Sequence, residues 1–81
     1  MKTEKQYRKA IGGALLNKRQ AMAEDGLKVT QEDIAEQAGI STRYYGNIER
    51  GNATPSIYTC ARIAEALQMT LPTFIELIEN Y

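Results

Sequence analysis

The sequence predicts an all-α fold, on three observations. Apolar residues recur at spacings of three, four or seven along the chain, and no stretch shows the sustained alternation of a half-buried strand. Serine or threonine stands before the later apolar segments, where it can cap the first turn of a helix. Glycine or proline punctuates the chain between segments. The predicted helices span residues 5–23, 31–38, 42–50, 57–67 and 71–80.

The first predicted helix is the longest. It carries Tyr7, Ile11 and Leu15 on one face and ends at the turn-forming residues 24–26. Two consecutive glycines at 12–13 weaken it, since each costs about 1 kcal/mol relative to alanine in a helix interior. We therefore expect its N-terminal end to fray.

The second and third predicted helices are short and close together. Thr30 is placed to cap the second helix, with Asp33 three residues later completing a capping box. Gly39 stops that helix, and Ser41 caps the next one. Two helices joined by a tight glycine turn have the form of a helix-turn-helix. The second helix of such a pair can lie in the major groove of B-DNA while the first crosses the phosphate backbone.

The fourth and fifth predicted helices have equally clear starts. Gly51 ends the third helix, and Ser56 begins the fourth, in which Cys60 is a small core residue. Thr70 caps the fifth, where Pro72 lies in the first turn and its missing N–H costs nothing.

The fifth helix, residues 71–81, carries apolar side chains on more than one face. A second apolar face favours a partner subunit, so we expect a homodimer. The alternative is that these side chains all fold back on the first and fourth helices. The predicted dimer-interface residues are Phe74, Ile75, Leu77, Ile78 and Tyr81.

Composition excludes several classes of function. With 81 residues the chain forms one domain. It has no histidine and one cysteine, which excludes a Cys/His zinc site, a disulfide framework and a histidine-based catalytic triad. We therefore expect no enzymatic activity, no metal and no cofactor. Without a signal-type or membrane-spanning apolar segment, we expect a soluble cytoplasmic protein.

Charge is balanced overall but segregated along the chain. Residues 1–19 hold six basic side chains against one acidic, and residues 24–36 hold five acidic against one basic. A net charge of zero argues against nucleic-acid binding, whereas this segregation leaves room for it. We interpret residues 1–6 as a basic N-terminal tail, either solvated or acting as a DNA-contacting arm.

The outward face of the third helix carries side chains suited to reading DNA. In a helix that begins at Thr42, Tyr45 and Ile48 take the core side. Arg43 can bind guanine O6 and N7 with both arms of its guanidinium, Thr42 can touch a thymine methyl, and Asn47 can read adenine. The candidate base-contacting residues are Thr42, Arg43, Tyr44 and Asn47.

These motifs resemble the Cro/C1-type (XRE) helix-turn-helix family over residues 7–78. The family pattern runs T-Q-E-x-[LI]-A-x-x-x-G-[VI]-S, then I-E-R-G, then P-S-[LI] and a closing A-x-x-L. The residues in register are Gln31, Ala35, Gly39, Ser41, Ile48, Glu49, Arg50, Gly51, Pro55, Ala64 and Leu67. The resemblance implies a single five-helix, lambda-repressor-like domain over residues 1–81, used by transcription regulators and commonly dimeric on a pseudo-palindromic operator.

The resemblance also implies residue roles. Gln31, Arg50 and Asn52 match phosphate-contacting positions, and the glutamine also braces the recognition helix. Arg19 matches an arginine that pairs with the glutamate at Glu49, which ties the first helix to the end of the third. Thr42, Arg43 and Asn47 match base-reading positions of the family.

Two departures from the family pattern carry expectations of their own. The segment MAEDGLKVT is longer than the usual link between the arginine and the glutamine, so the first helix or its loop is extended. Tyr45 stands where a smaller aliphatic residue is usual, so we expect its hydroxyl to reach solvent or a partner at the edge of the core.

The sequence thus predicts a sequence-specific, double-stranded DNA-binding regulator, of repressor or controller type, that acts by occupancy as a homodimer. The alternative is an antitoxin-type module that mainly binds a toxin and contacts DNA secondarily. That interpretation requires a toxin-binding segment, for which only the basic N-terminus is available. A polymerase is another conceivable protein partner, and no membrane association is expected.

Overall fold

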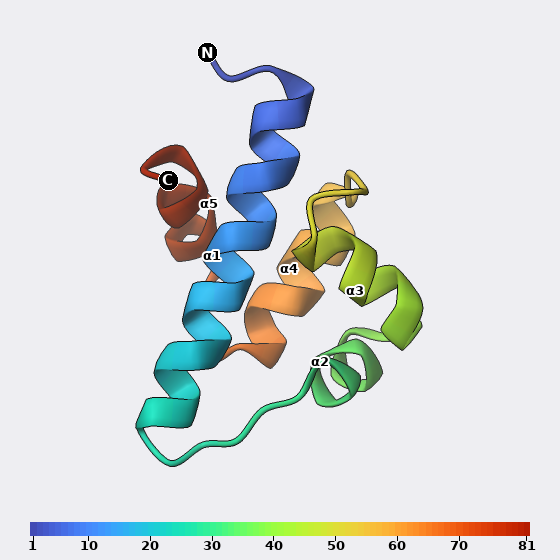
Figure 1. Ribbon diagram of the computed structural model, residues 1–81, viewed down its shortest axis with the longest axis vertical. Helices are drawn as coiled ribbons and strands as arrows, with labels where there is room; N and C mark the ends of the chain where they lie inside the picture. The colour runs from blue at the N-terminus through green and yellow to red at the C-terminus, as the bar shows by residue number, and fades with distance from the viewer.

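The computed structural model describes residues 1–81 as five α-helices without a strand (Figure 1). The helices are α1 (Glu4–Glu24), α2 (Gln31–Ala38), α3 (Thr42–Glu49), α4 (Ile57–Ala66) and α5 (Leu71–Glu79). This confirms the predicted all-α architecture. Each helix begins and ends within one residue of its predicted bounds. Between Arg19 and Gln31 the chain continues α1 to Glu24 and then forms a loop over residues 25–30.

A serine or threonine caps the N-terminus of every helix. At α2, the Asp33 N–H donates to Thr30 Oγ1 at 3.1 Å and the Thr30 N–H donates to Asp33 Oδ2 at 3.0 Å. That backbone hydrogen bond, together with the threonine side chain, holds the pKa of Asp33 below its ordinary value. These local caps explain why the helix bounds were predictable.

The structure corrects the predicted N-terminal tail. Thr3 and Gln6 form a capping box, with hydrogen bonds of 3.1 and 2.8 Å, so α1 begins at Glu4 and its first turn is stabilised against fraying. The Lys2 ammonium donates to the main-chain oxygen of Glu79 at 2.9 Å. This hydrogen bond joins the N-terminal segment to the end of α5, while residues 3–6 remain exposed.

The paired glycines of α1 are explained by close packing. Gly12 lies against the C-terminal end of α3, where a Cβ would stand 2.9 Å from the carbonyl carbon of Glu49 and closer still to its oxygen. Gly13 is covered by the ring of Tyr81. The conformational cost of glycine in α1 is therefore offset by the approach of α3 and of the chain's end.

The core lies between the helices and draws on all five. α1 packs against α3 and α5, and α2 packs against α3 and α4. In Figure 1, α5 and α3 stand on opposite sides of the molecule, with α1 and α4 between them. The largest fully buried side chains are Tyr45, Phe74, Leu15, Ile34, Ile48, Ile63 and Leu67.

The predicted dimer-interface set divides in two. Phe74 and Ile78 are only 0% and 4% exposed within the protomer. Withdrawing such a side chain from its core costs about 1.5–3 kcal/mol. The prediction that Phe74 and Ile78 contact another subunit is therefore wrong, because both side chains belong to the core of the protomer. Ile75, Leu77 and Tyr81 remain exposed. The helix therefore folds back with one face and presents the other.

No helix is both long enough and apolar enough to cross a membrane.

Candidate DNA-binding interface

The turn between α2 and α3 is closed by backbone geometry. Gly39 ends α2 in the left-handed conformation, with φ of 73°, which glycine adopts without the strain that a Cβ brings. The Ile40 N–H returns to the carbonyl of Ala35 at 3.0 Å, and Ser41 Oγ accepts from the Tyr44 N–H at 3.0 Å. The short turn thus fixes α3 relative to α2, as the helix-turn-helix prediction requires.

α3 has a buried side and an open side. Tyr45 and Ile48 are fully buried, as predicted. Thr42 and Arg43 are exposed, whereas Asn47 is half-buried. Figure 1 shows α3 at the edge of the molecule. The predicted base-contacting residues therefore lie together on the open side.

Tyr44 differs from the other three base-contacting candidates. It is half-buried and packs against the hydrophobic core. Its backbone N–H is used by the cap at Ser41. Less of its side chain is therefore available to DNA than that of Arg43.

The buried end of α3 is held by a three-residue network. Arg19 donates through Nε to Glu49 Oε2 at 2.9 Å and through Nη2 to Oε1 at 2.6 Å. Gln31 Nε2 donates to the same Oε1 at 2.9 Å. The network joins α1, α2 and α3, so the predicted Arg19–Glu49 pair and the bracing by Gln31 are both present.

Electrostatics make this network a stabilising one. The Glu49 side chain is 5% exposed and that of Arg19 is 20% exposed. Burial raises the pKa of Glu49, but the hydrogen bonds from Arg19 and Gln31 outweigh it and leave the pKa below its ordinary value. The hydrogen bond to Glu49 likewise raises the pKa of Arg19. Both groups are therefore charged at neutral pH.

Tyr45 does not meet the sequence expectation for its hydroxyl. The oxygen is buried and has no hydrogen-bond partner, although it was expected to reach solvent or a partner. Burial, and then the nearby Glu49 carboxylate, raise the pKa of Tyr45 far above its ordinary value. The hydroxyl nevertheless lies close enough to the Glu49 carboxylate and the Arg19 guanidinium for both charged groups to act on its pKa.

Arg50 makes a contact that the sequence did not predict. Its Nη2 donates to Asn47 Oδ1 at 2.8 Å, so a predicted phosphate contact and a predicted base contact are joined. Gly46, one turn before Arg50, has no side chain, and this leaves room for the Arg50 guanidinium beside it. The signal available in the sequence was an arginine three residues after an asparagine, which places both on one helical face.

The loop after α3 lies beside the basic part of α1. Asn52 is exposed, and its N–H closes the end of α3 on the carbonyl of Asn47 at 2.8 Å. Gly51, with φ of 79°, stands where a Cβ would be 3.5 Å from Lys9 Cα and 3.6 Å from the Arg8 carbonyl oxygen. The basic residues Arg8 and Lys9 of α1 therefore lie next to the loop that carries a predicted phosphate-contacting residue.

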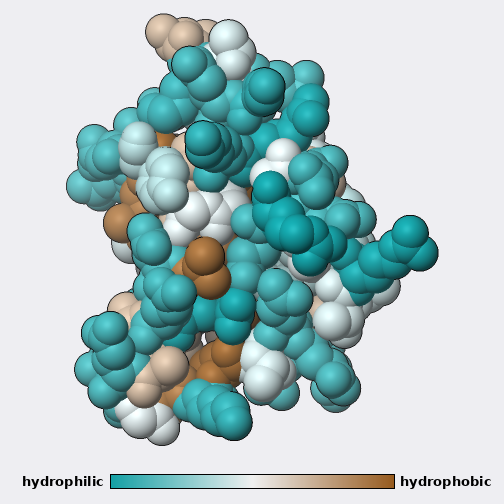
Figure 2. Space-filling view, in the orientation of Figure 1, coloured by the Kyte–Doolittle hydropathy of each residue, from teal (hydrophilic) through white to brown (hydrophobic).

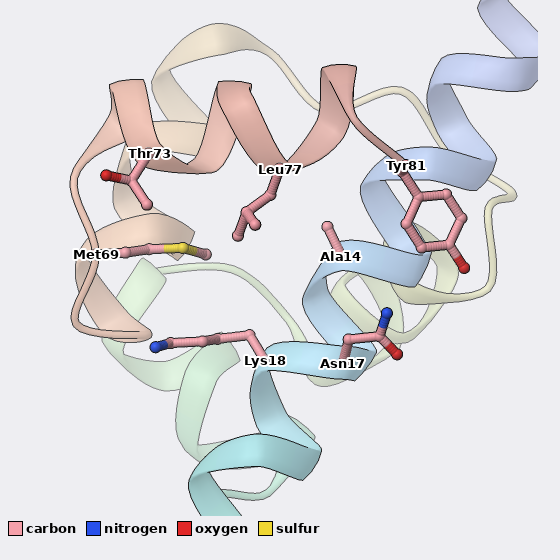
Figure 3. Close-up of a pocket in the computed structure, with 7 residues that line it drawn as sticks. All are labelled: Ala14, Asn17, Lys18, Met69, Thr73, Leu77 and Tyr81. Carbon is pink, nitrogen blue, oxygen red and sulfur yellow. The ribbon is translucent and has the colours of Figure 1, made fainter.

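α1 and α5 line an open pocket (Figure 3). Its volume is about 410 Å³. The exposed Leu77 and Tyr81 reach it from α5 and from the chain's end. The lining residues are Ala14, Asn17, Lys18, Met69, Thr73, Leu77 and Tyr81.

A second exposed apolar pair was missed by sequence reasoning. Ile57 and Tyr58, in the first turn of α4, are 65% and 66% exposed. Arg62 donates to the Tyr58 hydroxyl at 3.0 Å and to the Gln37 carbonyl at 3.2 Å, so the ring is fastened over the end of α2. Figure 2 shows that the face in view is mainly hydrophilic, with separate small apolar patches.

No three histidine, cysteine, aspartate or glutamate side chains come together in a group that could hold a metal ion. The single thiol, Cys60, is buried in the core, and its burial raises its pKa.

A family model described as HTH_3, helix-turn-helix, matches residues 19–74. A search of curated proteins finds no match.

Solved structures show a similar fold at 27% identity. Two are of the clp gene regulator ClgR from Corynebacterium glutamicum, with TM-scores of 0.74 and 0.77; each aligns with 91% of this chain, over 90% and 73% of the other. Another is an HTH_3 family transcriptional regulator from Vibrio cholerae, with a TM-score of 0.77, of which this chain spans 39%. Because the family match covers the network of Arg19, Gln31 and Glu49 and the whole of α3, the chain belongs to the HTH_3, Cro/C1-type helix-turn-helix family.

Proposed function

We propose that this chain is a sequence-specific transcriptional regulator that binds double-stranded DNA with α3 in the major groove. Its family and fold are those of DNA-binding regulators. The observation that carries the finer proposal is the division of α3 into an open side with Thr42 and Arg43 and a buried side fastened through Glu49. A rigidly held helix with exposed polar side chains suits base recognition, because binding then costs little conformational entropy.

Base contacts are assigned to the open side of α3. Arg43 is exposed and makes no salt bridge, so its guanidinium is free to bind guanine O6 and N7. Thr42 stands beside it at the helix start, within reach of a thymine methyl. Asn47 lies one turn further along, and Tyr44 contributes at the edge of the contact.

Phosphate contacts are assigned to the elements that flank α3. Gln31 begins α2, where unpaired N–H groups and the helix dipole favour an anion. Its Nε2 uses one proton on Glu49 and keeps a second for a phosphate oxygen. Arg50 and Asn52 are exposed at the C-terminal end of α3, the end that Gln31 contacts through Glu49. Phosphate groups contacted by these residues would fix the register of α3 in the groove.

A homodimer through α5 is part of the proposal. Ile75, Leu77 and Tyr81 are 39%, 42% and 55% exposed, and Leu77 and Tyr81 line the pocket between α1 and α5. α5 and α3 stand on opposite sides of the protomer (Figure 1), so pairing through α5 leaves both copies of α3 free. A two-fold axis of this kind suits recognition helices about 34–36 Å apart, which is one turn of DNA.

The similar structures support a regulatory role. ClgR is described as a clp gene regulator, and the Vibrio cholerae protein as a transcriptional regulator. We assign this chain the same general role, as a repressor or controller that acts by occupying its operator.

Selection of bound duplexes from a random-sequence pool at about 150 mM salt, where nonspecific contacts are weak, tests the proposal. We expect enrichment of a two-fold-symmetric motif with half-sites one turn apart. A single half-site would retain DNA recognition and contradict the dimer. No enrichment would contradict the proposed function and favour the antitoxin-type alternative, in which a protein is the main partner.

A further inference from the structure

Asn47 and Arg50 form a hydrogen-bonded pair at the open side of α3. The guanidinium Nη2 of Arg50 donates to Asn47 Oδ1 at 2.8 Å. A guanidinium carries donors only, so the amide atom that faces it must be the oxygen. This bond therefore orients the amide. Oδ1 is engaged with a charged donor, and the groups left free are the two N–H donors of Nδ2.

Gly46 leaves the space that this arrangement needs. A Cβ at that position would stand 3.0 Å from Arg50 Nη1 and 3.3 Å from Nη2, which is closer than the usual 3.5–4.0 Å between packed atoms. Gly46 does not have a positive φ, so its backbone conformation is open to other residues. Glycine also destabilises a helix interior relative to alanine. The nearest atoms to such a Cβ belong to Arg50, and Gln31 Oε1 follows at 3.4 Å, so glycine here fits the side chain of Arg50 first.

Resting on the proposed function, we infer that Gly46 and Arg50 are positioning residues that make Asn47 a donor-only reader, selective for guanine. Guanine offers two acceptors in the major groove, O6 and N7, whereas adenine offers the N7 acceptor and the N6 donor. The paired contact to adenine requires Oδ1 of Asn47 as acceptor. Arg50 competes for that oxygen, which disfavours the adenine contact predicted from the sequence.

Base selection with wild type, Asn47→Ala, Gly46→Ala and Arg50→Ala tests this inference. Asn47→Ala identifies the base pair concerned, because preference there is lost. In the wild type we expect guanine over adenine at that position by on the order of tenfold. Gly46→Ala and Arg50→Ala should bring that ratio to about one or reverse it. The preference that depends on Arg43 should stay unchanged in both variants, which makes it the internal control.

Stability separates this effect from damage to the fold. Gly46→Ala should leave the melting temperature unchanged or raise it, because alanine favours the helix and the displaced group is the exposed end of Arg50. If Gly46→Ala does not fold, Arg50→Ala decides the matter, since that side chain is exposed. If Arg50 made only a phosphate contact, Arg50→Ala would weaken binding to all sequences alike and would leave the guanine-to-adenine ratio unchanged.

Several results would overturn the inference. The first is a wild-type preference for adenine at the position that depends on Asn47. The second is that no position depends on Asn47. The third is a guanine preference that survives in both Gly46→Ala and Arg50→Ala. A motif that is enriched but insensitive to these substitutions defeats the inference alone. Absence of any motif for the wild type defeats the proposed function and the inference with it.

Discussion

Glu49 and Arg50 are neighbours in the chain and serve opposite sides of α3. The Glu49 side chain is 5% exposed and accepts three hydrogen bonds from α1 and α2. Arg50 is exposed, and its side chain hydrogen-bonds to Asn47 in the last turn of α3. The buried residue ties α3 to the rest of the fold, and the exposed one belongs to the surface offered to DNA. Stability and recognition are thereby divided between two adjacent residues.

The largest expected effect of breaking this division is at Glu49. Glu49→Gln should lower the free energy of unfolding by about 2 kcal/mol, less than the 3–5 kcal/mol of a fully buried pair, because Arg19 keeps 20% of its side chain exposed. Urea denaturation measures the change, with the exposed Glu76→Gln as control. The base preference of the variant should be that of the wild type. Altered preference without lost stability would contradict the structural role.

The converse effect is expected on the open side. Arg43→Ala should cost about 1–3 kcal/mol of discrimination at one base pair while leaving the urea midpoint unchanged, since Arg43 is exposed. Arg43→Lys is the matched variant: it keeps the charge but lacks the planar fork, and should lose the same preference. If the lysine variant keeps full preference, the contact is electrostatic rather than bidentate. Competition binding with single-base operator variants measures both.

A substitution remote from α3 should change neither the stability of the protomer nor the base preference of α3. Leu77→Glu places a charge on the exposed face of α5 and should raise the dimer dissociation constant by on the order of tenfold, or about 1.4 kcal/mol. Sedimentation equilibrium measures the change. Leu27→Glu, at an exposed leucine in the loop after α1, is the control. Dissociation by Ile57→Glu instead would place the interface at the first turn of α4.

The smallest expected effect is a pH dependence of the Glu49 contribution. The folded-state pKa of Glu49 is lowered from the ordinary value of 4.5, so folding favours its charged form. The resulting stability is present above pH 4.5 and is lost as the pH falls through the folded-state value. The stability difference between wild type and Glu49→Gln should therefore shrink below that pH. A difference that is constant from pH 7 to pH 3 would show that geometry alone stabilises the network.

Local features of the fold were predictable from the sequence, and distant contacts were not. Thr30, Ser41 and Thr70 act within a few residues of their own positions, so their helix starts could be read directly. The Arg19–Glu49 pair was available only through the resemblance. The fastening of Lys2 and Tyr7 to Glu79 joins residues 77 and 72 positions apart, beyond any local pattern.

The candidate site shows the same limit. Periodicity placed Tyr45 and Ile48 inside and Thr42 and Arg43 outside, because one helix face determines the other. It could not divide Phe74 from Leu77, since both lie on an apolar helix and only the packing of α1 and α4 decides which face is buried. The role of Gly46 depends on where the guanidinium of Arg50 lies, which is a side-chain conformation rather than a sequence pattern.

The most direct test of the central claim is to follow backbone amide NMR shifts of the wild type during titration with its selected operator. The account predicts the largest changes at the start of α2, along α3 and in the loop through Asn52, with Glu49 keeping its network. Changes concentrated on α5 and the pocket beside it, with α3 unaffected, would contradict the assignment of α3 as the DNA-reading helix.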